Sequence, residues 1–215
     1  MIHLSNIRPT PLLEMHNGIS QTSGVFGTTC EFEKGKNYLI TARSGKGKST
    51  LMHIIYGLRT DFQGQLLINN TDATQMNAED WANLRQNQLS IVFQDLRLFP
   101  TLSVLENLFI KANLTDSIRS EEINDMVERL EMTPFIHQTA ETLSYGQRQR
   151  IAIIRALCQP FSMLLLDEPF SHLDQKNIEL ATDLIHEKLL KHHAGVILAS
   201  LDDGYGYEFD FQLEI

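Results

Sequence analysis

The chain reads Ala42-Arg43-Ser44-Gly45-Lys46-Gly47-Lys48-Ser49, followed by Thr50, between an apolar run and a helical pattern. This octapeptide matches the phosphate-binding pattern G-x-x-x-x-G-K-[ST] at every fixed position except the first. We expect a strand at 38–41 before it and a helix from Lys48 to about Gly57 after it, because apolar residues recur there at helical spacing. Strand, glycine-bearing loop and helix in this order predict the α/β fold of a P-loop NTPase.

Each fixed residue of the loop has a physical role toward a bound phosphate. Gly45 and Gly47 let the backbone curl until successive N–H groups point at phosphate oxygens. Lys48 can reach the β- and γ-phosphates of a nucleotide, and the hydroxyl of Ser49 can bind Mg²⁺. The helix that begins here adds a favourable dipole for an anion. Ala42 stands in place of the first glycine, and we expect a modest effect if its φ stays negative.

Apolar runs alternate with helical patterns along much of the chain, which predicts a largely parallel sheet. Besides the strand before the phosphate loop, we expect strands at residues 2–7, 28–32, 65–68, 89–93, 163–166, 196–199 and 209–215. The run Met163–Leu166 is apolar throughout and suits a strand that is covered on both faces. A long helix is expected from about Gln175 to His192.

Residues 102–143 differ from the rest because consecutive helical patterns follow one another there without a strand. Apolar side chains recur at helical spacing, for example within residues 123–130. We therefore place an inserted helical subdomain at residues 95–158, between two parts of an α/β core at 1–94 and 159–215. The whole chain then forms a single α/β P-loop NTPase domain with a mixed, mainly parallel sheet core, an N-terminal antiparallel β part and the inserted helices.

Two carboxylates, Asp167 and Glu168, follow the apolar run 163–166 directly. Ligands bind at the carboxyl ends of the strands in open α/β folds, so both side chains are expected at the nucleotide. We expect Asp167 to hold Mg²⁺ through water and Glu168 to act as general base on the attacking water. Gln94 follows another strand, and its amide can accept from water and ligate Mg²⁺. Together with Lys48 these groups suffice for hydrolysis, because phosphoryl transfer needs mainly positioned oxygens and neutralised charge.

The composition argues against several other classes of protein. The 215 residues carry a formal net charge of −9, which disfavours a nucleic-acid binder held by a general basic field. Neither an apolar run of membrane-spanning length nor a signal-peptide pattern is present, so we expect a cytoplasmic protein that reaches a membrane only through a partner. Cys30 and Cys158 have apolar neighbours and no metal-ligand spacing, and we expect both to be reduced and buried.

Five motifs in order resemble those of the ABC transporter ATPases, and the resemblance covers nearly the full length of the chain. The Walker A loop is Ala42–Thr50, and the Q-loop is Val92-Phe93-Gln94-Asp95. The signature motif is Leu143-Ser144-Tyr145-Gly146-Gln147, which opens a basic helix. The Walker B motif is Met163–Glu168, and the D-loop is Ser171-His172-Leu173-Asp174.

The resemblance implies a head-to-tail dimer that sandwiches two ATP molecules, each with Mg²⁺. Ser144 and Gly146 of one subunit would meet the γ-phosphate held by the other. A hydroxyl, a glycine N–H and a helix N-terminus together make an anion site, so this arrangement is physically consistent. By the same resemblance, Gln147 and Asp174 are expected to contact the nucleotide. Dimerisation should depend on ATP.

The resemblance also implies two kinds of protein partner and no nucleic acid. One is a second ATPase cassette, which is either another copy of this chain or a different chain. The other is an integral membrane permease, which would hold the cassette at the inner face of the cell membrane and to which the apolar loop at Phe99-Pro100 could dock. Within the family, residues 84–94 and 98–107 are similar to the lipoprotein-release and macrolide-export group, and some amino-acid importers and cell-division ATPases share much of this sequence.

The chain departs from the family pattern in three places. Tyr145 replaces the glycine usual in the middle of the signature, and its side chain is expected along the dimer interface. His16 is the only flat ring in residues 14–21, where the family stacks an aromatic ring on adenine, and an ordinary surface histidine is favoured over stacking. Leu201 stands after Ser200, where the family usually places a histidine. Leucine has no hydrogen-bonding group and cannot contact the γ-phosphate or the attacking water.

Two hypotheses about function remain open. In the first, the chain hydrolyses ATP to drive a permease, and the retained Glu168 with the lost histidine predicts slow hydrolysis but intact ATP binding. In the second, it is a hydrolysis-impaired dimerisation switch or the degenerate half of a heterodimeric cassette pair, with Leu201 marking the lost turnover. His172 is a possible substitute for the lost histidine, although a histidine at a variable position of this kind is more often incidental. An ATPase without a permease is disfavoured, because such proteins usually carry two cassettes in one chain.

Overall fold

The computed structural model describes residues 1–13, 23–115, 117–201, 205 and 207–215. Within these ranges a central parallel sheet is made of β3 (Asn37–Thr41), β6 (Leu89–Val92), β7 (Met163–Asp167), β8 (Gly195–Ser200) and β9 (Phe211–Glu214). The strand order is β6-β7-β8-β3-β9, and each neighbouring pair runs parallel.

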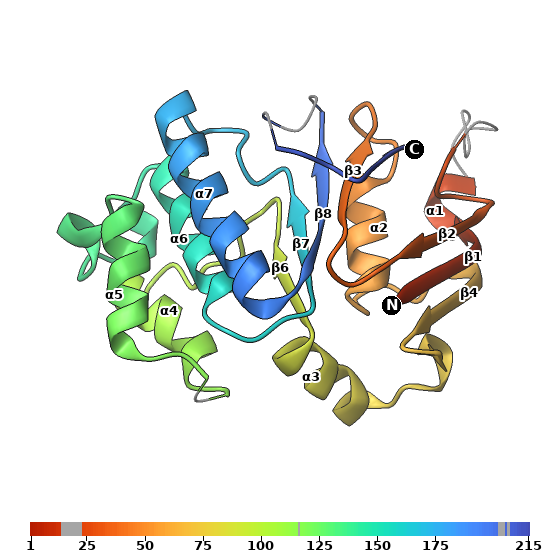
Figure 1. Cartoon of the computed structure of the whole chain (residues 1–215), viewed down its shortest axis with the longest axis horizontal. Helices are drawn as coiled ribbons and strands as arrows, with labels where there is room; N and C mark the ends of the chain where they lie inside the picture. Colours follow the sequence, from red (N-terminus) through yellow and green to blue (C-terminus); the bar gives the residue numbers. More distant parts are fainter. Residues whose placement is uncertain (14–22, 116, 202–204, 206) are drawn as a thin grey trace.

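A second, antiparallel sheet lies at one end of the molecule (Figure 1). In order across the sheet it consists of β2 (Thr29–Phe32), β1 (Ile2–Pro9), β4 (Phe62–Ile68) and β5 (Thr71–Asp72). Gly64 in β4 has a φ of 96°, and a Cβ there would come within 2.3 Å of the Asn6 carbonyl in β1. Glycine at this position therefore lets the two central strands approach each other.

The helices flank the parallel sheet on both sides (Figure 1). They are α1 (Thr10–Leu13), α2 (Lys48–Ile55), α3 (Ala78–Asn87), α4 (Val104–Ala112), α5 (Ser120–Arg129), α6 (Tyr145–Leu157) and α7 (Gln175–His192). Short 3-10 turns are formed by Ala73–Gln75, Thr133–Phe135 and Ala140–Thr142. Helices α4 to α7 gather on the side away from the antiparallel sheet, whereas α2 lies between the two sheets (Figure 1).

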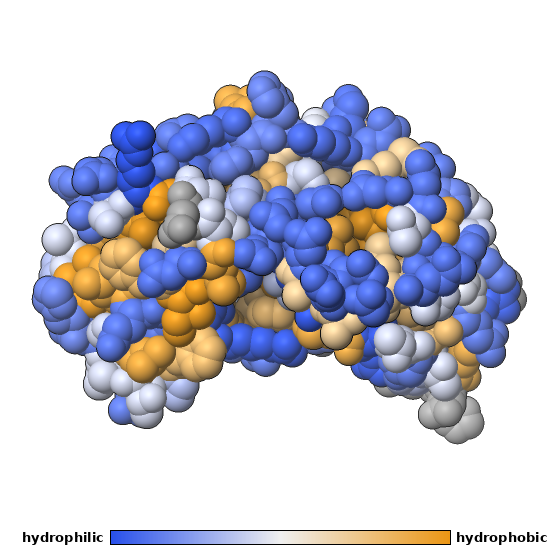
Figure 2. Space-filling model, turned by 90° about the horizontal axis from the view of Figure 1, so that it is seen from below, coloured by the Kyte–Doolittle hydropathy of each residue, from blue (hydrophilic) through white to orange (hydrophobic). Residues whose placement is uncertain are grey.

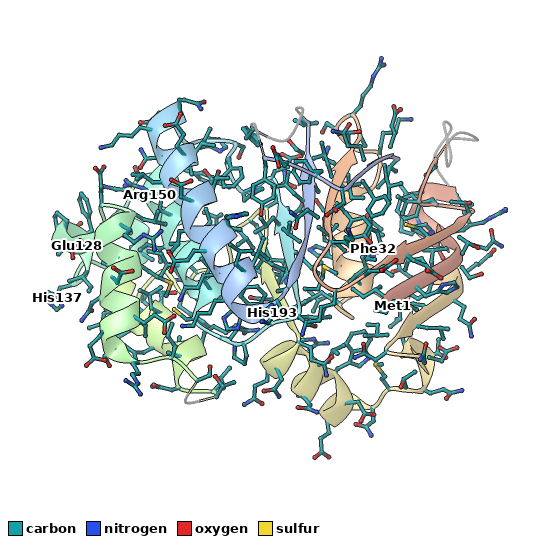
Figure 3. All side chains as sticks on the ribbon, viewed as in Figure 1. Met1, Phe32, Glu128, His137, Arg150 and His193 are labelled. Atoms are coloured by element: carbon teal, nitrogen blue, oxygen red, sulfur yellow. The ribbon has the colours of Figure 1, made fainter. Side chains whose placement is uncertain are left out.

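Two clusters of buried apolar side chains lie on the two faces of the parallel sheet. Along β7, Leu164 and Leu166 face the cluster shared with α4 to α7, whereas Met163 and Leu165 face the cluster shared with α2 and the antiparallel sheet. This alternation follows from the period of two in a strand, and it explains why the run is apolar at every position. Phe32 is fully buried in the second cluster (Figure 3).

The register of the parallel strands brings their carboxyl ends together. Thr41 of β3 pairs with Ser200 of β8, Asp167 of β7 pairs with Ala199, and Val92 of β6 pairs with Leu166. The phosphate loop, the two carboxylates, the Q-loop and Leu201 therefore leave the sheet at one edge. This edge is where the candidate site is built.

The predicted fold class is confirmed. The strands were placed correctly to within a few residues, but α1 and β5 were not predicted, and the parallel sheet contains no antiparallel pair among the described residues. Cys30 and Cys158 are free and buried, as expected, and burial raises their pKa values to about 11 and about 12. None of the helices in the described part of the chain has the length and apolar character needed to cross a membrane.

Candidate functional site

The phosphate loop connects β3 to α2, and Gly47 caps the helix without a side-chain hydrogen bond. Gly45 and Gly47 have φ values of 79° and 111°, in the left-handed region that favours glycine. A Cβ on Gly47 would also lie 2.7 Å from Leu12 and 2.8 Å from Phe26. Ala42 is not among the described residues with positive φ, so the condition for tolerating alanine is met. The helix start is left without a capping side chain, which suits an anion.

Lys48 has two partners among the described residues of the protein. Its side chain is 5% exposed, and Nζ donates to the carbonyl of Ala42 at 2.8 Å. The same Nζ lies 3.3 Å from Oε1 of Glu168. Glu168 has a φ of 50°, a costly conformation that clusters at functional sites, and its N–H donates to the carbonyl of Ala199 in β8. A phosphate that contacts Lys48 would therefore compete with a carboxylate that the fold holds in place.

Gln94 connects the phosphate loop to Glu168. The hydroxyl of Ser49 donates to Oε1 of Gln94 at 3.1 Å, and Nε2 of Gln94 donates to Oε2 of Glu168 at 3.4 Å. Three residues predicted from three separate motifs are thus joined by hydrogen bonds. An amide next to a carboxylate can both hold and orient a water molecule.

Asp167 is the most unusual buried group of the site. Its side chain is 1% exposed, and neither carboxylate oxygen has a hydrogen-bond partner among the described residues. Burial raises the pKa of Asp167 to about 6, and the nearby Ser49 hydroxyl is the main influence that opposes this rise. A buried carboxylate without partners costs free energy, so the site is built to receive a group that neutralises it.

A magnesium ion fits this donor set. Mg²⁺ prefers oxygen ligands and is usually bound by one or two carboxylates together with water and phosphate oxygens. Asp167, Ser49 and Gln94 offer a carboxylate, a hydroxyl and an amide oxygen around a hollow of about 290 Å³ that also borders His53 and Asp95. No group of three His, Cys, Asp or Glu suited to a metal occurs in the described part of the chain. A metal here would therefore depend on this mixed oxygen set and on the nucleotide.

A neighbouring hollow of about 300 Å³ opens over the phosphate loop. Its lining residues are Pro11, Leu12, Ser44, Gly45, Gly47, Lys48, Ser49, Thr50, Arg59, Gln94 and Glu168. Arg43 and Lys46 of the predicted loop are not among them. Arg59, which was not predicted, pairs with Asp61 at its rim, and no motif in the sequence singles it out. No aromatic ring lines this hollow within the described residues, and His16 lies outside them.

The signature turn forms the start of α6 rather than part of this hollow. Ser144 is the N-cap, and its hydroxyl oxygen accepts from the N–H of Gln147 at 3.2 Å, while Oε1 of Gln147 accepts from the N–H of Ser144 at 2.8 Å. A Cβ on Gly146 would lie 2.9 Å from the carbonyl oxygen of His172, so glycine is needed for close packing within the chain. The structure therefore does not bring Ser144, Gly146 or Gln147 to the chain's own phosphate loop.

Tyr145 makes three contacts within the described part of its own chain. Its hydroxyl donates to the main-chain carbonyl of Gln94 at 2.8 Å. Its ring lies 4.2 Å from the ring of His172, and the guanidinium of Arg148 lies 5.3 Å from the ring centre. His172, which also bonds Ser171 through Nδ1, is thus held against Tyr145.

Two further side chains make hydrogen bonds at the D-loop, and one of them also reaches Glu168. Asp174 is the N-cap of α7, and Oδ1 accepts from the N–H of Asn177 at 2.9 Å. Gln149 was not predicted, yet it is 1% exposed and donates to the carbonyl of Glu168 at 3.3 Å and to Ser171 at 3.1 Å. The burial of Gln149 could have been predicted from its spacing. It stands three residues before Ala152 and four before Ile153, so it shares the buried face of the helix with them.

Leu201 follows β8 at the same sheet edge as the carboxylates. Its side chain is 55% exposed, while Ser200 before it is buried. The register places this end of β8 between the ends of β3 and β7, beside the phosphate loop and Glu168. Leu201 therefore lies at the sheet edge that carries the site, and its side chain offers no hydrogen-bonding group there.

The comparisons with known proteins agree with this geometry. A sequence model of the family described as ABC transporter matches residues 25–171. The chain belongs to the ABC transporter family. Its fold and motifs are those of an ATP-binding cassette of the ABC ATPases, so the predicted family is confirmed.

Relatives of known name cover most of this cassette. The ABC transporter ATP-binding protein YtrE of Bacillus subtilis (strain 168) is 33% identical over 173 residues, which are 79% of this chain and 75% of YtrE. The lipoprotein-releasing system ATP-binding protein LolD of Buchnera aphidicola subsp. Schizaphis graminum (strain Sg) is 36% identical over 160 residues, which are 73% of this chain and 70% of LolD. The similarity therefore includes the lipoprotein-release group and extends beyond it.

Solved structures of the bacterial ABC transporter cassette MJ0796 share the whole fold. A dimeric structure matches with a TM-score of 0.82 at 25% identity and covers 100% of this chain and 94% of that one. A dimeric post-hydrolysis state bound to ADP and Pi also matches with a TM-score of 0.82, at 26% identity over 100% of this chain and 96% of that one. These structures show dimers and nucleotide for MJ0796.

Proposed function

We propose that this cassette binds ATP with Mg²⁺, closes head to tail on a second cassette, and hydrolyses the ATP to drive a membrane permease. The observation that carries this proposal is the meeting of five groups at one sheet edge. A buried lysine, a hydroxyl, an amide, an unpartnered buried carboxylate and a second carboxylate lie beside an uncapped helix start: Lys48, Ser49, Gln94, Asp167 and Glu168.

Each group has a role in the proposed hydrolysis. The N–H groups at the start of α2 and the ammonium of Lys48 hold the β- and γ-phosphates. Gln94 orients a water molecule, and Glu168 accepts its proton while the water oxygen bonds to the γ-phosphorus and the bond to the β-phosphate oxygen breaks. Mg²⁺ bound near Asp167 and Ser49 would neutralise charge on the phosphate oxygens. The contact between Lys48 and Glu168 then changes into separate contacts with phosphate and water.

The second cassette would complete each ATP site. At the start of α6, the oxygen of Ser144 already accepts a backbone hydrogen bond, but its hydroxyl hydrogen is available to donate. That hydrogen and the N–H of Gly146 can meet the γ-phosphate bound by the partner. The contributions of Gln147 and Asp174 would be indirect, because both side chains cap helices in this chain. The partner is a second copy of this chain or a related cassette.

The permease would contact the helical end of the cassette and hold it at the inner face of the membrane. Hydrophobic side chains gather on that end of the molecule in the view from below (Figure 2). Phe99 before α4, Ile110 within it and Leu114 after it are large, apolar and exposed. We propose that residues 95–158 act as the subdomain that passes movement to the permease, through the loop at Phe99-Pro100. Exposed apolar groups of this kind favour a protein partner.

A second candidate function rests on Leu201. An ATP-dependent dimerisation switch, or the weak half of a heterodimeric pair, needs ATP binding but no turnover. The phosphate loop and carboxylates support binding, whereas the apolar side chain at position 201 removes one hydrogen-bonding group from the reaction. Retention of Glu168 in its strained conformation favours the hydrolysing form, because a binding switch has no need of a general base.

ATP turnover by the purified chain with Mg²⁺, measured beside the Glu168→Gln variant together with oligomeric state, tests the proposal. Glutamine keeps the size of the side chain but cannot accept the proton, so turnover should fall by roughly a hundredfold or more. Dimers that form with ATP should then persist in the variant. Equal turnover in both chains contradicts the assigned base, and ATP-dependent dimers without turnover in either chain support the switch.

A further inference from the structure

Tyr145 connects the signature turn to the Q-loop of the same chain. It is the first residue of α6, and its hydroxyl donates to the main-chain carbonyl of Gln94. The side chain of Gln94 in turn contacts Ser49 and Glu168. The hydrogen bond from Tyr145 therefore holds the backbone of Gln94, whose side chain lies between the Ser49 hydroxyl and the Glu168 carboxylate.

The segment after Gln94 is held by α6 at several points. Leu96 and Arg97 have φ values of 61° and 47°, which are costly for residues with side chains. Arg155, at the other end of α6, donates to the carbonyls of Leu96 and Arg97 at 2.7 Å each. The strained segment is thus fixed by Arg155 at one end and by Tyr145 at Gln94. A strained backbone persists only when its surroundings determine it in this way.

We propose that Tyr145 is a positioning residue for hydrolysis: its hydroxyl fixes the main chain at Gln94 and so sets the Gln94 amide between Ser49 and Glu168. This inference rests on the proposed function. A glycine at position 145, the residue usual in the family, has no group that can make this link. The link also joins the start of α6, which would face a partner's nucleotide, to the catalytic edge of its own chain.

The geometry separates the hydroxyl from the rest of the side chain. The ring of Tyr145 packs against His172 and lies under Arg148, and these contacts do not require the oxygen. The hydroxyl has a different partner, the Gln94 carbonyl. Tyr145→Phe therefore keeps the packing and removes only the bond to the Q-loop.

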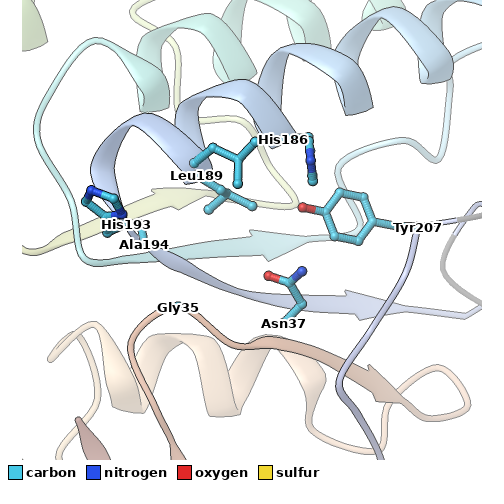
Figure 4. Close-up of a pocket in the computed structure, with 8 residues that line it drawn as sticks. Gly35, Asn37, His186, Leu189, His193, Ala194 and Tyr207 are labelled. Carbon is cyan, nitrogen blue, oxygen red and sulfur yellow. The ribbon is translucent and has the colours of Figure 1, made fainter.

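The matched control is Tyr207→Phe. Tyr207 lies beside His186 of α7, in a hollow that Leu189 also lines (Figure 4). Its hydroxyl is buried and has no hydrogen-bond partner among the described residues. Removing that oxygen takes away the same group at a place outside the site, so ATP turnover should not change.

Steady-state kinetics with ATP and Mg²⁺ form the first test. The loss of one hydrogen bond that positions a catalytic group lowers the rate of the chemical step by a small factor. Tyr145→Phe should therefore lower kcat by about threefold to tenfold, with KM for ATP unchanged. Tyr145→Gly should lower kcat at least as much. A kcat equal to that of Tyr207→Phe overturns the proposal, as does a loss confined to KM.

A double-mutant cycle shows whether Tyr145 acts through Gln94. In a Gln94→Ala background the amide is gone, so Tyr145→Phe should no longer lower kcat. Losses that multiply independently would mean that the tyrosine acts by another route, and the proposal would fail. A purely structural role for Tyr145 would also give independent losses.

Amide hydrogen exchange tests the link without any hydrolysis. The N–H of Leu96 donates to the carbonyl of Phe93, and the N–H of Arg97 donates to that of Asp95. Loss of the anchor at Gln94 should speed exchange at both amides by about threefold or more in Tyr145→Phe and leave it unchanged in Tyr207→Phe. Unchanged exchange in Tyr145→Phe refutes the link. If the wild-type chain turns over no ATP, the proposed function fails, while this measurement still decides whether Tyr145 fixes the Q-loop.

Discussion

The helices α2 and α6 both begin at a turn suited to an anion, but their surroundings within the chain differ. The start of α2 has no capping side chain, and Lys48, Asp167 and Glu168 lie around it. The start of α6 is closed by a capping box between Ser144 and Gln147, and none of its residues lines the phosphate-loop hollow. The start of α2 thus opens into a hollow lined by charged and polar groups, whereas the start of α6 is preformed by its own capping hydrogen bonds and lies outside that hollow.

This difference explains why the cassette should act as a pair. A γ-phosphate at α2 would have contacts on the side of its own chain only, and a signature turn from a second chain can supply hydroxyl and N–H donors on the other side. The capping box keeps the turn of α6 rigid before any partner arrives, which lowers the entropy lost on association. On the proposed account, one chain therefore carries two half-sites that do not meet within it. The α2 half-site consists of Lys48, Ser49, Gln94, Asp167 and Glu168, and the α6 half-site consists of Ser144 and Gly146.

Gly146→Ala should break the α6 half-site and leave the α2 half-site intact. The new Cβ would lie 2.9 Å from the His172 carbonyl, so the start of α6 must shift. We expect ATP binding by the single chain to persist, ATP-dependent dimers to disappear, and turnover to fall by roughly a hundredfold. Gly24→Ala is the control, because the nearest atom to its Cβ would be at 3.5 Å and its φ needs no glycine. Dimers of Gly146→Ala that form as readily as the wild type would disprove the role of this turn.

Leu201→His should increase the rate of ATP hydrolysis at the α2 half-site. The position is 55% exposed, so histidine fits without disturbing the core, and it adds a hydrogen-bonding group at the edge that carries Glu168. One well-placed group of this kind is worth roughly tenfold to a hundredfold in turnover. Leu190→His, at a 63% exposed position on α7, controls for the added histidine. An unchanged rate would mean that Leu201 does not limit hydrolysis.

Asp167 should make the stability of the nucleotide-free chain depend on pH. Its pKa in the fold is about 6, raised by burial from 3.8, so the folded state binds the proton more tightly than the unfolded state. The resulting stability is fully present below pH 4 and is lost as pH rises through about 6. The total change corresponds to about 3 kcal/mol.

Thermal unfolding of the wild type and of Asp167→Asn between pH 4 and pH 7 measures this effect. Asparagine does not titrate, so the variant should gain stability relative to the wild type as pH rises. Asp125→Asn, at an exposed position on α5, is the control for the loss of one carboxylate. Parallel curves for the wild type and Asp167→Asn would show that folding does not raise the pKa of Asp167.

Most of the fold could be predicted from the sequence, because the patterns that indicate its strands, helices and phosphate loop are local. The phosphate loop was readable from the spacing of Gly45, Gly47, Lys48 and Ser49, and β7 from an apolar run that two-sided burial explains. The short helix α1 was missed because four residues carry no periodic signal. Its Leu12 nevertheless packs against the phosphate loop and makes glycine necessary at Gly47.

The contacts between motifs were the part that sequence reasoning could not supply. Tyr145 and Gln94 are 51 positions apart, and nothing in either motif indicates that a tyrosine hydroxyl would bond a backbone carbonyl. The pairing of Lys48 with Glu168 likewise depends on the register of β3, β8 and β7. Such contacts arise from the packing of whole elements, so only the tertiary structure reveals them.

The central claim is that the α2 half-site of one chain works with the α6 half-site of another. Mixing two inactive variants tests this claim most directly. A chain with Lys48→Ala and a chain with Gly146→Ala should each be nearly inactive alone. Mixed dimers of the two hold one fully intact site, so an equal mixture should recover up to roughly a quarter of the wild-type turnover. A mixture no more active than the sum of its two components would contradict the head-to-tail account.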